Sequence, residues 1–310
     1  MTEKKWITKT WVVVLLALIC CLLWGSAFSG VKIGYEKFKI DSSDWSSQMV
    51  FAGVRFSIAG IMALMIGSIL EKKILLPKKT SFHKIAVISF FQTVAQYFFY
   101  YIGLAHTTGV KAAIIVSANV FTAILISALI FKMEKLTAIK IVGSVIGFVG
   151  IIVINLGGFS AGLKLNFLGD GFIFLCTVAS GFSSVFMKKY SAGENPVMLS
   201  GWQFFFGGVV MLVFGLVFGG RMTVSTVSSV LILLYLSFVS AAAYSLWATL
   251  LKYNPVSKVA VFGFMNPVCG VIISSFVLGE KGAFSIQGLL ALVLVCLGIW
   301  IVNSEKENQK

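Results

Sequence analysis

Long apolar stretches separated by short polar links follow one another along the whole chain. Each stretch has close to the roughly 20 residues that a helix needs to cross a bilayer. Ten such helices are predicted, at 11–33, 48–70, 84–104, 110–131, 137–156, 168–188, 197–219, 230–251, 256–278 and 284–302. They are apolar nearly all round, as membrane-spanning helices are. The pattern therefore predicts an all-α integral membrane protein.

Composition agrees with this prediction. Hydrophobic residues make up 58% of the chain and charged residues 12%, whereas a soluble domain carries roughly 25% charge. The net charge of +14 would suit a nucleic-acid partner, but most of the lysines lie in the links between apolar stretches. We therefore expect no nucleic-acid partner.

The distribution of basic residues predicts the orientation. Seventeen of the 25 Lys and Arg residues lie in the tails and links on the side of the N-terminus, and six lie in the links on the other side. Links rich in Lys and Arg stay in the cytoplasm. The sequence therefore predicts an inner-membrane protein with cytoplasmic tails at residues 1–10 and 304–310.

The two halves of the chain resemble each other at a nearly constant offset. The matched pairs are Arg55 with Gln203, Gly60 with Gly208, Tyr97 with Tyr244, Lys111 with Lys258, and Asn119 with Asn266, at offsets of 147 or 148 residues. Two five-helix repeats are predicted, at 11–157 and 167–303. Because five is odd, the second repeat enters the membrane inverted, and inverted repeats are typical of transporters.

Sequence signatures of catalysis and metal binding are absent. The five cysteines lie in apolar stretches without metal-ligand spacing. No P-loop, HExxH, GxSxG or dinucleotide-binding glycine pattern occurs. We therefore expect no enzyme activity, metal site or cofactor. A membrane-embedded enzyme and a non-transporting receptor or assembly subunit stay open as alternatives.

Three stretches resemble the EamA family of the drug/metabolite transporter superfamily. They are LLWGSAF at 22–28, LGD at 168–170 and NPVCGVIISSFVLGEK at 266–281. The resemblance implies ten helices in two inverted repeats and transport of small metabolites, commonly amino acids and their derivatives, often outward. A sugar, nucleotide sugar or drug is the alternative substrate. Val120 stands where the family often has a proline. The sequence therefore does not decide whether the fourth helix is kinked.

Polar residues at the centre of apolar helices are the first candidates for a substrate site. Asn266 and Pro267 lie at the middle of the ninth helix, and Asn119 holds the corresponding place in the fourth. Proline opens the helical hydrogen-bond ladder one turn upstream, near Gly263, so Pro267 is a candidate gate. The alternative for both asparagines is hydrogen bonding between helices.

Further candidates are an arginine and several aromatic and amide side chains. Arg55 lies about 10 Å inside the second helix, where it would bind a carboxylate or extend to the lipid headgroups. The remaining predicted lining residues are Trp24, Gln96, Tyr97, Trp202, Gln203, Tyr244 and Trp247. Aromatic walls with few polar groups suit a small-molecule site, although each aromatic could equally pack against lipid.

No Asp or Glu falls deep in a predicted span. This disfavours cationic substrates and favours a facilitator or exchanger, since proton-driven pumps usually place a carboxylate in the membrane. The expected partners are a small-molecule substrate and the lipid bilayer. A monomer would suffice, and a homodimer is compatible with the sequence. The predicted mechanism is alternating access around a cavity at the membrane midplane.

Overall fold

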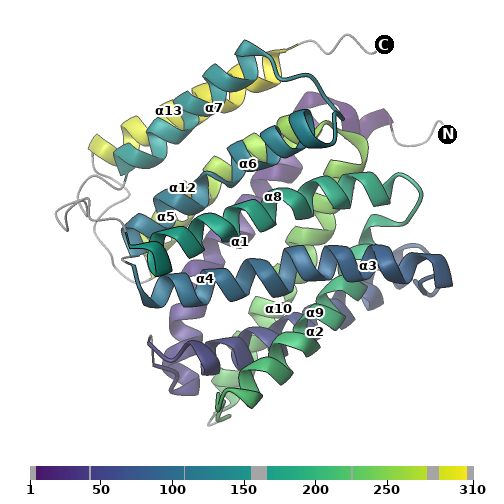
Figure 1. Ribbon diagram of the computed structural model, residues 1–310, viewed down its shortest axis with the longest axis vertical. Helices are drawn as coiled ribbons and strands as arrows, with labels where there is room; N and C mark the ends of the chain where they lie inside the picture. The colour runs from purple at the N-terminus through teal and green to yellow at the C-terminus, as the bar shows by residue number, and fades with distance from the viewer. Residues whose placement is uncertain are drawn as a thin grey trace.

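The structure, a computed structural model, describes residues 5–41, 43–107, 109–154, 166–224, 226–277 and 286–305. Within these ranges it consists of helices, without strands. Eight helices are long and apolar enough to cross a membrane, and two shorter apolar helices complete the set. The predicted class, an all-α membrane protein with ten spanning helices, is thus confirmed (Figure 1).

The first five spans form the first repeat. They are α1 (Thr10–Phe38), α2 (Trp45–Leu70), a third span of α3 (Phe82–Ser89), η3 (Phe90–Ala95) and α4 (Gln96–Ala105), a fourth of α5 (Gly109–Ser117), α6 (Asn119–Leu125) and η4 (Ile126–Ile130), and α7 (Ala138–Ile154). Short 3₁₀ turns η1 (Lys5–Thr8) and η2 (Lys79–Ser81) precede the first and third spans.

The other five spans form the second repeat. They are a sixth span of η6 (Phe167–Gly171) and α8 (Phe172–Ser191), then α9 (Pro196–Val217), α10 (Val227–Tyr253), a ninth span of α11 (Val256–Ala260), η7 (Val261–Phe264) and α12 (Met265–Val277), and α13 (Ile286–Ser304).

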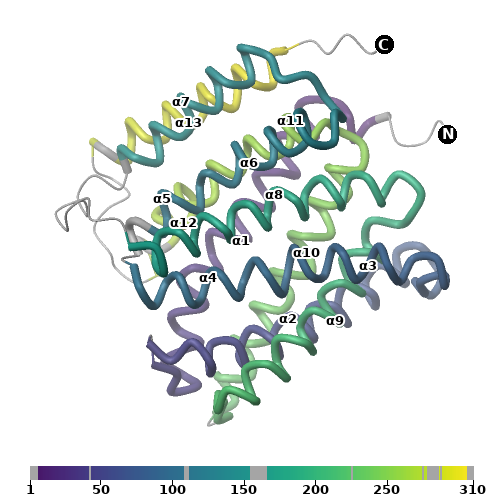
Figure 2. Tube along the Cα trace, viewed as in Figure 1, coloured from purple at the N-terminus to yellow at the C-terminus, as the bar shows by residue number. Residues whose placement is uncertain are grey.

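Links that the sequence assigns to one side of the membrane meet at one end of the bundle, which also carries both chain ends (Figure 2). Hydrogen bonds join Lys84 to Glu194, Lys252 to the Glu194 carbonyl, Asn254 to the Ile7 carbonyl, and Thr137 to Glu305. We call this end the terminal face. The other links meet at the opposite face, where Thr107 donates to Asp170 and Ser229 to the Lys37 carbonyl.

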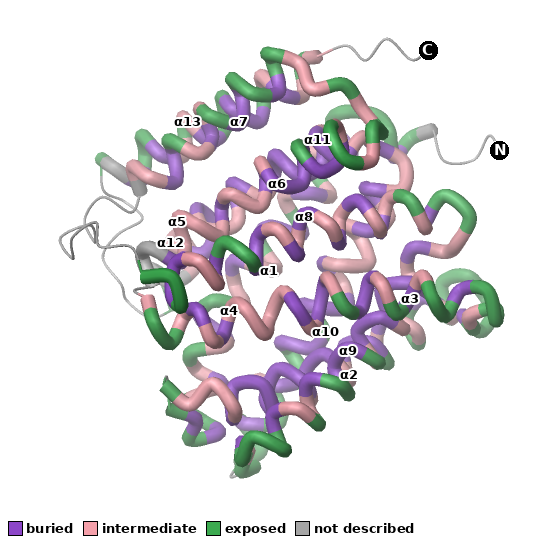
Figure 3. Tube along the Cα trace, viewed as in Figure 1, coloured by how far each residue is buried: buried purple, intermediate pink, exposed green. Residues whose placement is uncertain are grey.

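Glycine contacts between the repeats confirm the inverted symmetry. A methyl group built on Gly53 of α2 would lie 2.8 Å from the Gly208 carbonyl oxygen of α9, and one on Gly60 would lie 2.6 Å from the Gly201 carbonyl oxygen. A shift of 148 positions relates Gly53 to Gly201 and Gly60 to Gly208, so it converts the residue pair of the first contact into the pair of the second. Buried positions dominate where α2 and α9 pack together (Figure 3).

The ninth span is irregular where the sequence predicts it. The α-helical pattern gives way to the 3₁₀ turn η7 just upstream of Pro267, since proline lacks the amide hydrogen that a regular helix would use. The Cys21 thiol of α1 donates to the nearby Phe262 carbonyl at 3.2 Å.

The fourth span is interrupted too, which settles the question left open by Val120. The helix breaks at Ala118, directly before Asn119. Ser117 donates its hydroxyl to the Ala113 carbonyl, a side-chain bond of the kind that bends helices. At the repeat offset of 147 residues, Ala118 corresponds to Met265, directly after the interruption at 261–264.

Candidate functional site

Four aromatic rings from both repeats meet at the pseudo-twofold axis. Phe56 and Phe204 stack with centroids 5.1 Å apart, and the hydroxyls of Tyr97 and Tyr244 hydrogen-bond at 3.2 Å. The ring centroids of Phe56 and Tyr97 lie 4.6 Å apart, and those of Phe204 and Tyr244 lie 4.8 Å apart. Each phenylalanine and each tyrosine thus meets its own repeat counterpart. We call these four residues the axis cluster.

Predicted residues of α1 and α10 extend the axis cluster. The ring of Trp24 packs edge-on against the rings of Tyr244 and Trp247, with ring centroids 4.9 Å and 5.0 Å apart. The side chain of Gln96 approaches the Tyr244 hydroxyl. Four aromatic residues predicted from the sequence, Trp24, Tyr97, Tyr244 and Trp247, and the predicted amide Gln96 therefore lie at or next to the axis.

Arg55 is buried within this aromatic region. Its side chain is 6% exposed, and its guanidinium carbon lies 4.4 Å from the centroid of the Phe56 ring. Helix α2 begins at Trp45. Arg55 lies ten residues further on, about 15 Å along the helix axis from that end. This depth and burial exclude the alternative that the side chain extends to the lipid headgroups.

Gln203, the repeat counterpart of Arg55, also lies in the interior. It is fully buried, and its side-chain oxygen accepts a hydrogen bond from Thr93 at 2.7 Å. The symmetry therefore places a cation on one side of the axis and a neutral amide on the other.

The two predicted asparagines belong to the crossing of the fourth and ninth spans. The side-chain oxygen of Asn119 would lie 3.6 Å from a methyl group built on Gly263 of η7. Asn266 follows one turn later, at the start of α12. Helix α12 itself packs against α1, where a methyl group on Gly25 would touch Cys269 at 2.7 Å.

Buried polar atoms without partners concentrate in the predicted residues. Within the described ranges, seven buried side-chain nitrogen or oxygen atoms lack a hydrogen bond. Four belong to Trp24, Arg55, Gln203 and Asn266. A buried polar atom without a partner costs about 1–3 kcal/mol, so such atoms require an explanation, and a polar ligand is one.

Trp202 lies apart from the other predicted residues. Its indole nitrogen donates to the Leu75 carbonyl at 3.0 Å, and its ring stacks on Phe206 at 5.5 Å. Leu75 belongs to the link between α2 and η2, so Trp202 lies near the terminal face.

Sequence reasoning missed several neighbours of the site. Tyr35, Phe56, Thr93 and Phe204 were not among the predicted residues, although Phe56 and Phe204 share the repeat offset. Tyr35 lies near Arg55 and Tyr101 because α1 continues to Phe38. The predicted helix, at 11–33, ends before Tyr35.

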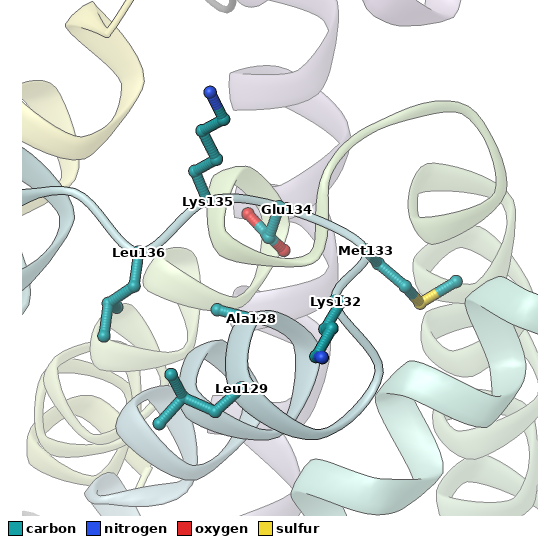
Figure 4. A pocket seen from close by; sticks show the side chains of 7 residues that line it. All are labelled: Ala128, Leu129, Lys132, Met133, Glu134, Lys135 and Leu136. Atoms are coloured by element: carbon teal, nitrogen blue, oxygen red, sulfur yellow. The ribbon is translucent and has the colours of Figure 1, made fainter.

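A hollow of about 570 Å³ lies at the terminal face, away from these residues (Figure 4). It is lined by residues 128 and 129 of the fourth span and by residues 132–136 of the following link. Its acidic side chain, Glu134, already accepts hydrogen bonds from Ser127 and Lys140 at 2.8 Å each. We therefore assign this hollow to the link and not to the candidate site.

The bond between Tyr97 and Tyr244 yields a first prediction. Replacing either residue with Phe should lower the free energy of unfolding by about 1 kcal/mol, because a hydrogen bond is lost. The double variant should cost little more than one single variant, because both changes remove the same bond. Thermal unfolding of the four purified proteins checks this; strictly additive losses would contradict the bond.

The chain matches the profile of the EamA-like transporter family twice, at residues 11–156 and 167–304. An uncharacterized transporter of Archaeoglobus fulgidus is 26% identical over 95% of this chain and 98% of its own length. The uncharacterized transporter YvbV of Bacillus subtilis is 25% identical over 99% of this chain and 96% of its own length. The uncharacterized inner membrane transporter YedA of Escherichia coli is 26% identical over 90% of this chain and 89% of its own length.

A solved crystal structure shares the fold. It superposes with a TM-score of 0.76 at 16% identity, covering 94% of this chain and 96% of the other. Two family matches, ten spans and the reciprocal contacts between repeats agree with one another. The chain is a multi-pass membrane transporter that belongs to the EamA-like transporter family.

Proposed function

We propose that the protein is a secondary transporter that exports small metabolites, namely amino acids or related compounds, by alternating access. The substrate binds at the axis cluster and at the polar residues beside it. The two repeats then rock about the axis, with Pro267 and η7 as the weak point of the ninth span. On this proposal the protein transports its substrate without altering it chemically.

The main support for this proposal comes from the buried polar atoms that have no hydrogen-bond partner. The unpaired atoms of Trp24, Arg55, Gln203 and Asn266 come from α1, α2, α9 and α12, so they belong to both repeats. Transporters with inverted repeats bind substrate near the midplane, where the repeats meet. A polar substrate at this place would supply the missing hydrogen bonds.

Charge distribution supports the orientation. The described links at the terminal face belong to the side of the chain to which the sequence assigns seventeen of the 25 Lys and Arg residues. By the positive-inside rule this face is the cytoplasmic one. We therefore propose an inner-membrane location with both termini in the cytoplasm, and a monomer as the transporting unit.

Metabolite export from cells tests the proposal. The wild type and an Asn266→Trp variant are overexpressed in a bacterial host, and the spent medium is profiled by untargeted mass spectrometry. We expect metabolites that accumulate outside only with the wild type, because an indole at residue 266 would occupy the site. Their identity separates amino acids from sugars, nucleotide sugars and drugs.

Leu289→Trp provides the matched control. Leu289 of α13 is 60% exposed, so the same bulky ring is added away from the site and export should persist. Equal profiles for wild type and Asn266→Trp, with both proteins present in the membrane, would contradict the proposal.

A further inference from the structure

Arg55 has an unusual environment for a buried cation. No Asp or Glu within the described ranges pairs with it, and its Nε atom has no hydrogen-bond partner. Burying a charge without a counter-ion is costly, and proteins rarely retain such a charge without use. The ring of Phe56 offsets only part of this cost. The site therefore lacks one negative charge.

Several tyrosines lie near the Arg55 guanidinium. Tyr35, Tyr97, Tyr101 and Tyr244 all lie within electrostatic range of Arg55. Tyr97 and Tyr244 share one hydrogen bond, which leaves this pair one hydroxyl hydrogen to donate to an anion. A guanidinium binds a carboxylate with two parallel hydrogen bonds. Together these groups resemble a receptor for one carboxylate among aromatic rings.

The charge of the whole site restricts the substrate further. A net monoanion would make the occupied site neutral. A zwitterion would leave one buried positive charge, because the acidic residues of the described spans, Glu36 and Asp170, lie in the end turns of those spans and not at the axis. A dianion such as phosphate would leave one excess negative charge.

The inverted repeat also orients the substrate. Arg55 lies about 15 Å from the end of α2 at the opposite face, whereas Gln203 lies about 10 Å from the end of α9 at the terminal face. The cation thus lies on the side of the axis nearer the opposite face, and the neutral amide lies nearer the terminal face.

We infer that the transported compounds are net monoanionic organic acids, whose carboxylate binds Arg55 and whose remaining part contacts Trp24, Gln203 and Asn266. This inference rests on the proposed function and narrows it to amino-acid derivatives that lack a free ammonium group and to related organic acids. The bound carboxylate points toward the opposite face.

The export assay with arginine variants tests the inference. Cells express the wild type, Arg55→Met, Arg55→Lys or Arg221→Gln, and the host's own metabolites serve as the probe. The exported compounds should be monoanionic carboxylates. Their export should fall about ten-fold or more with Arg55→Met, because a charge-assisted hydrogen bond is lost. Arg55→Lys should restore part of it.

Two controls separate binding from folding. Arg221 is exposed in the link between α9 and α10, so Arg221→Gln should export normally. Purified Arg55→Met should unfold at a temperature equal to or above that of the wild type, because it removes an unpaired buried charge. A lower unfolding temperature would indicate a structural role for Arg55 and overturn the inference.

The outcomes distinguish the inference from the proposed function. Export of neutral, zwitterionic or cationic compounds that Asn266→Trp abolishes would overturn the inference and leave the proposed function standing. Carboxylate export that survives Arg55→Met would do the same. Absence of any wild-type export would contradict both.

Discussion

Replacing Gly60 with Leu is expected to prevent most of the protein from reaching its folded state. A methyl group on Gly60 would already lie 2.5 Å from the Phe205 amide nitrogen and 2.6 Å from the Gly201 carbonyl oxygen. Both neighbours are backbone atoms of α9, so no side chain can rotate away. Overpacking commonly costs 1–3 kcal/mol, and a contact with backbone should cost about 3 kcal/mol or more, a large share of typical stability.

Gly193 offers the matched control. It lies in the link between α8 and α9, and no atom lies within 4 Å of a methyl group built on it. The amount of monodisperse protein in detergent and its unfolding temperature should fall sharply for Gly60→Leu and change little for Gly193→Leu. Equal behaviour of the two variants would show that α2 and α9 do not approach as closely as described.

The pseudo-twofold symmetry explains why the sequence could predict that several candidate residues lie close together. Residues near a pseudo-twofold axis lie close to their own repeat counterparts, so a constant offset in the sequence identifies pairs that meet in space. Tyr97 and Tyr244 follow this rule, with a separation of 147 residues and a hydrogen bond between them. The repeat thus carries three-dimensional information that the hydrophobic pattern alone does not contain.

Local departures from regular helix were harder to predict. The third span contains the π-helical turn η3, from Phe90 to Ala95, which rotates the residues after it relative to those before. Residues three positions apart, which would share one face of a regular helix, therefore have different partners. Thr93 faces Gln203, whereas Gln96 approaches Tyr244.

Tertiary partners decided the remaining placements. Trp202 precedes Gln203 in the sequence, but the carbonyl of Leu75 accepts its indole hydrogen and keeps it near the terminal face. The fourth span breaks at Ala118 without a proline, where side-chain hydroxyls bond to backbone carbonyls. Sequence patterns do not contain these partners, because they lie in other elements or depend on rotamers.

The second large effect is expected at the terminal face, around Glu134. This carboxylate lies 2.8 Å from the Lys140 amine and accepts hydrogen bonds from the Ser257 amide and hydroxyl at the start of α11. The side chains of Glu134 and Lys140 are 4% and 6% exposed. The pair thus joins the link after the fourth span to α7 and to the ninth span.

The pKa of Glu134 reflects this environment. Burial alone would raise the pKa of its carboxyl, but hydrogen bonds from Lys140, Ser257 and Ser127 and the charge of Lys140 outweigh burial and lower it. A carboxyl with a lowered pKa in the folded state stabilises the protein at neutral pH. That contribution should be lost as the pH falls through the folded-state pKa, below the ordinary value of 4.5.

Glu134→Gln should lower the free energy of unfolding by about 3–5 kcal/mol, because it leaves the buried Lys140 amine without its counter-ion. Glu134→Gln combined with Lys140→Met should recover part of this loss, since neither charge then remains unpaired. Glu71→Gln is the control, because the Glu71 and Lys73 side chains are 32% and 65% exposed and such pairs contribute about 0–1 kcal/mol.

Thermal unfolding of the purified proteins at neutral and acidic pH measures both effects. The wild type should lose stability on acidification, and Glu134→Gln should lose less, because its amide cannot titrate. A Glu134→Gln protein as stable as the wild type would mean that the pair contributes no more than an exposed one. The start of the ninth span would then be held without any contribution from the charge of Glu134.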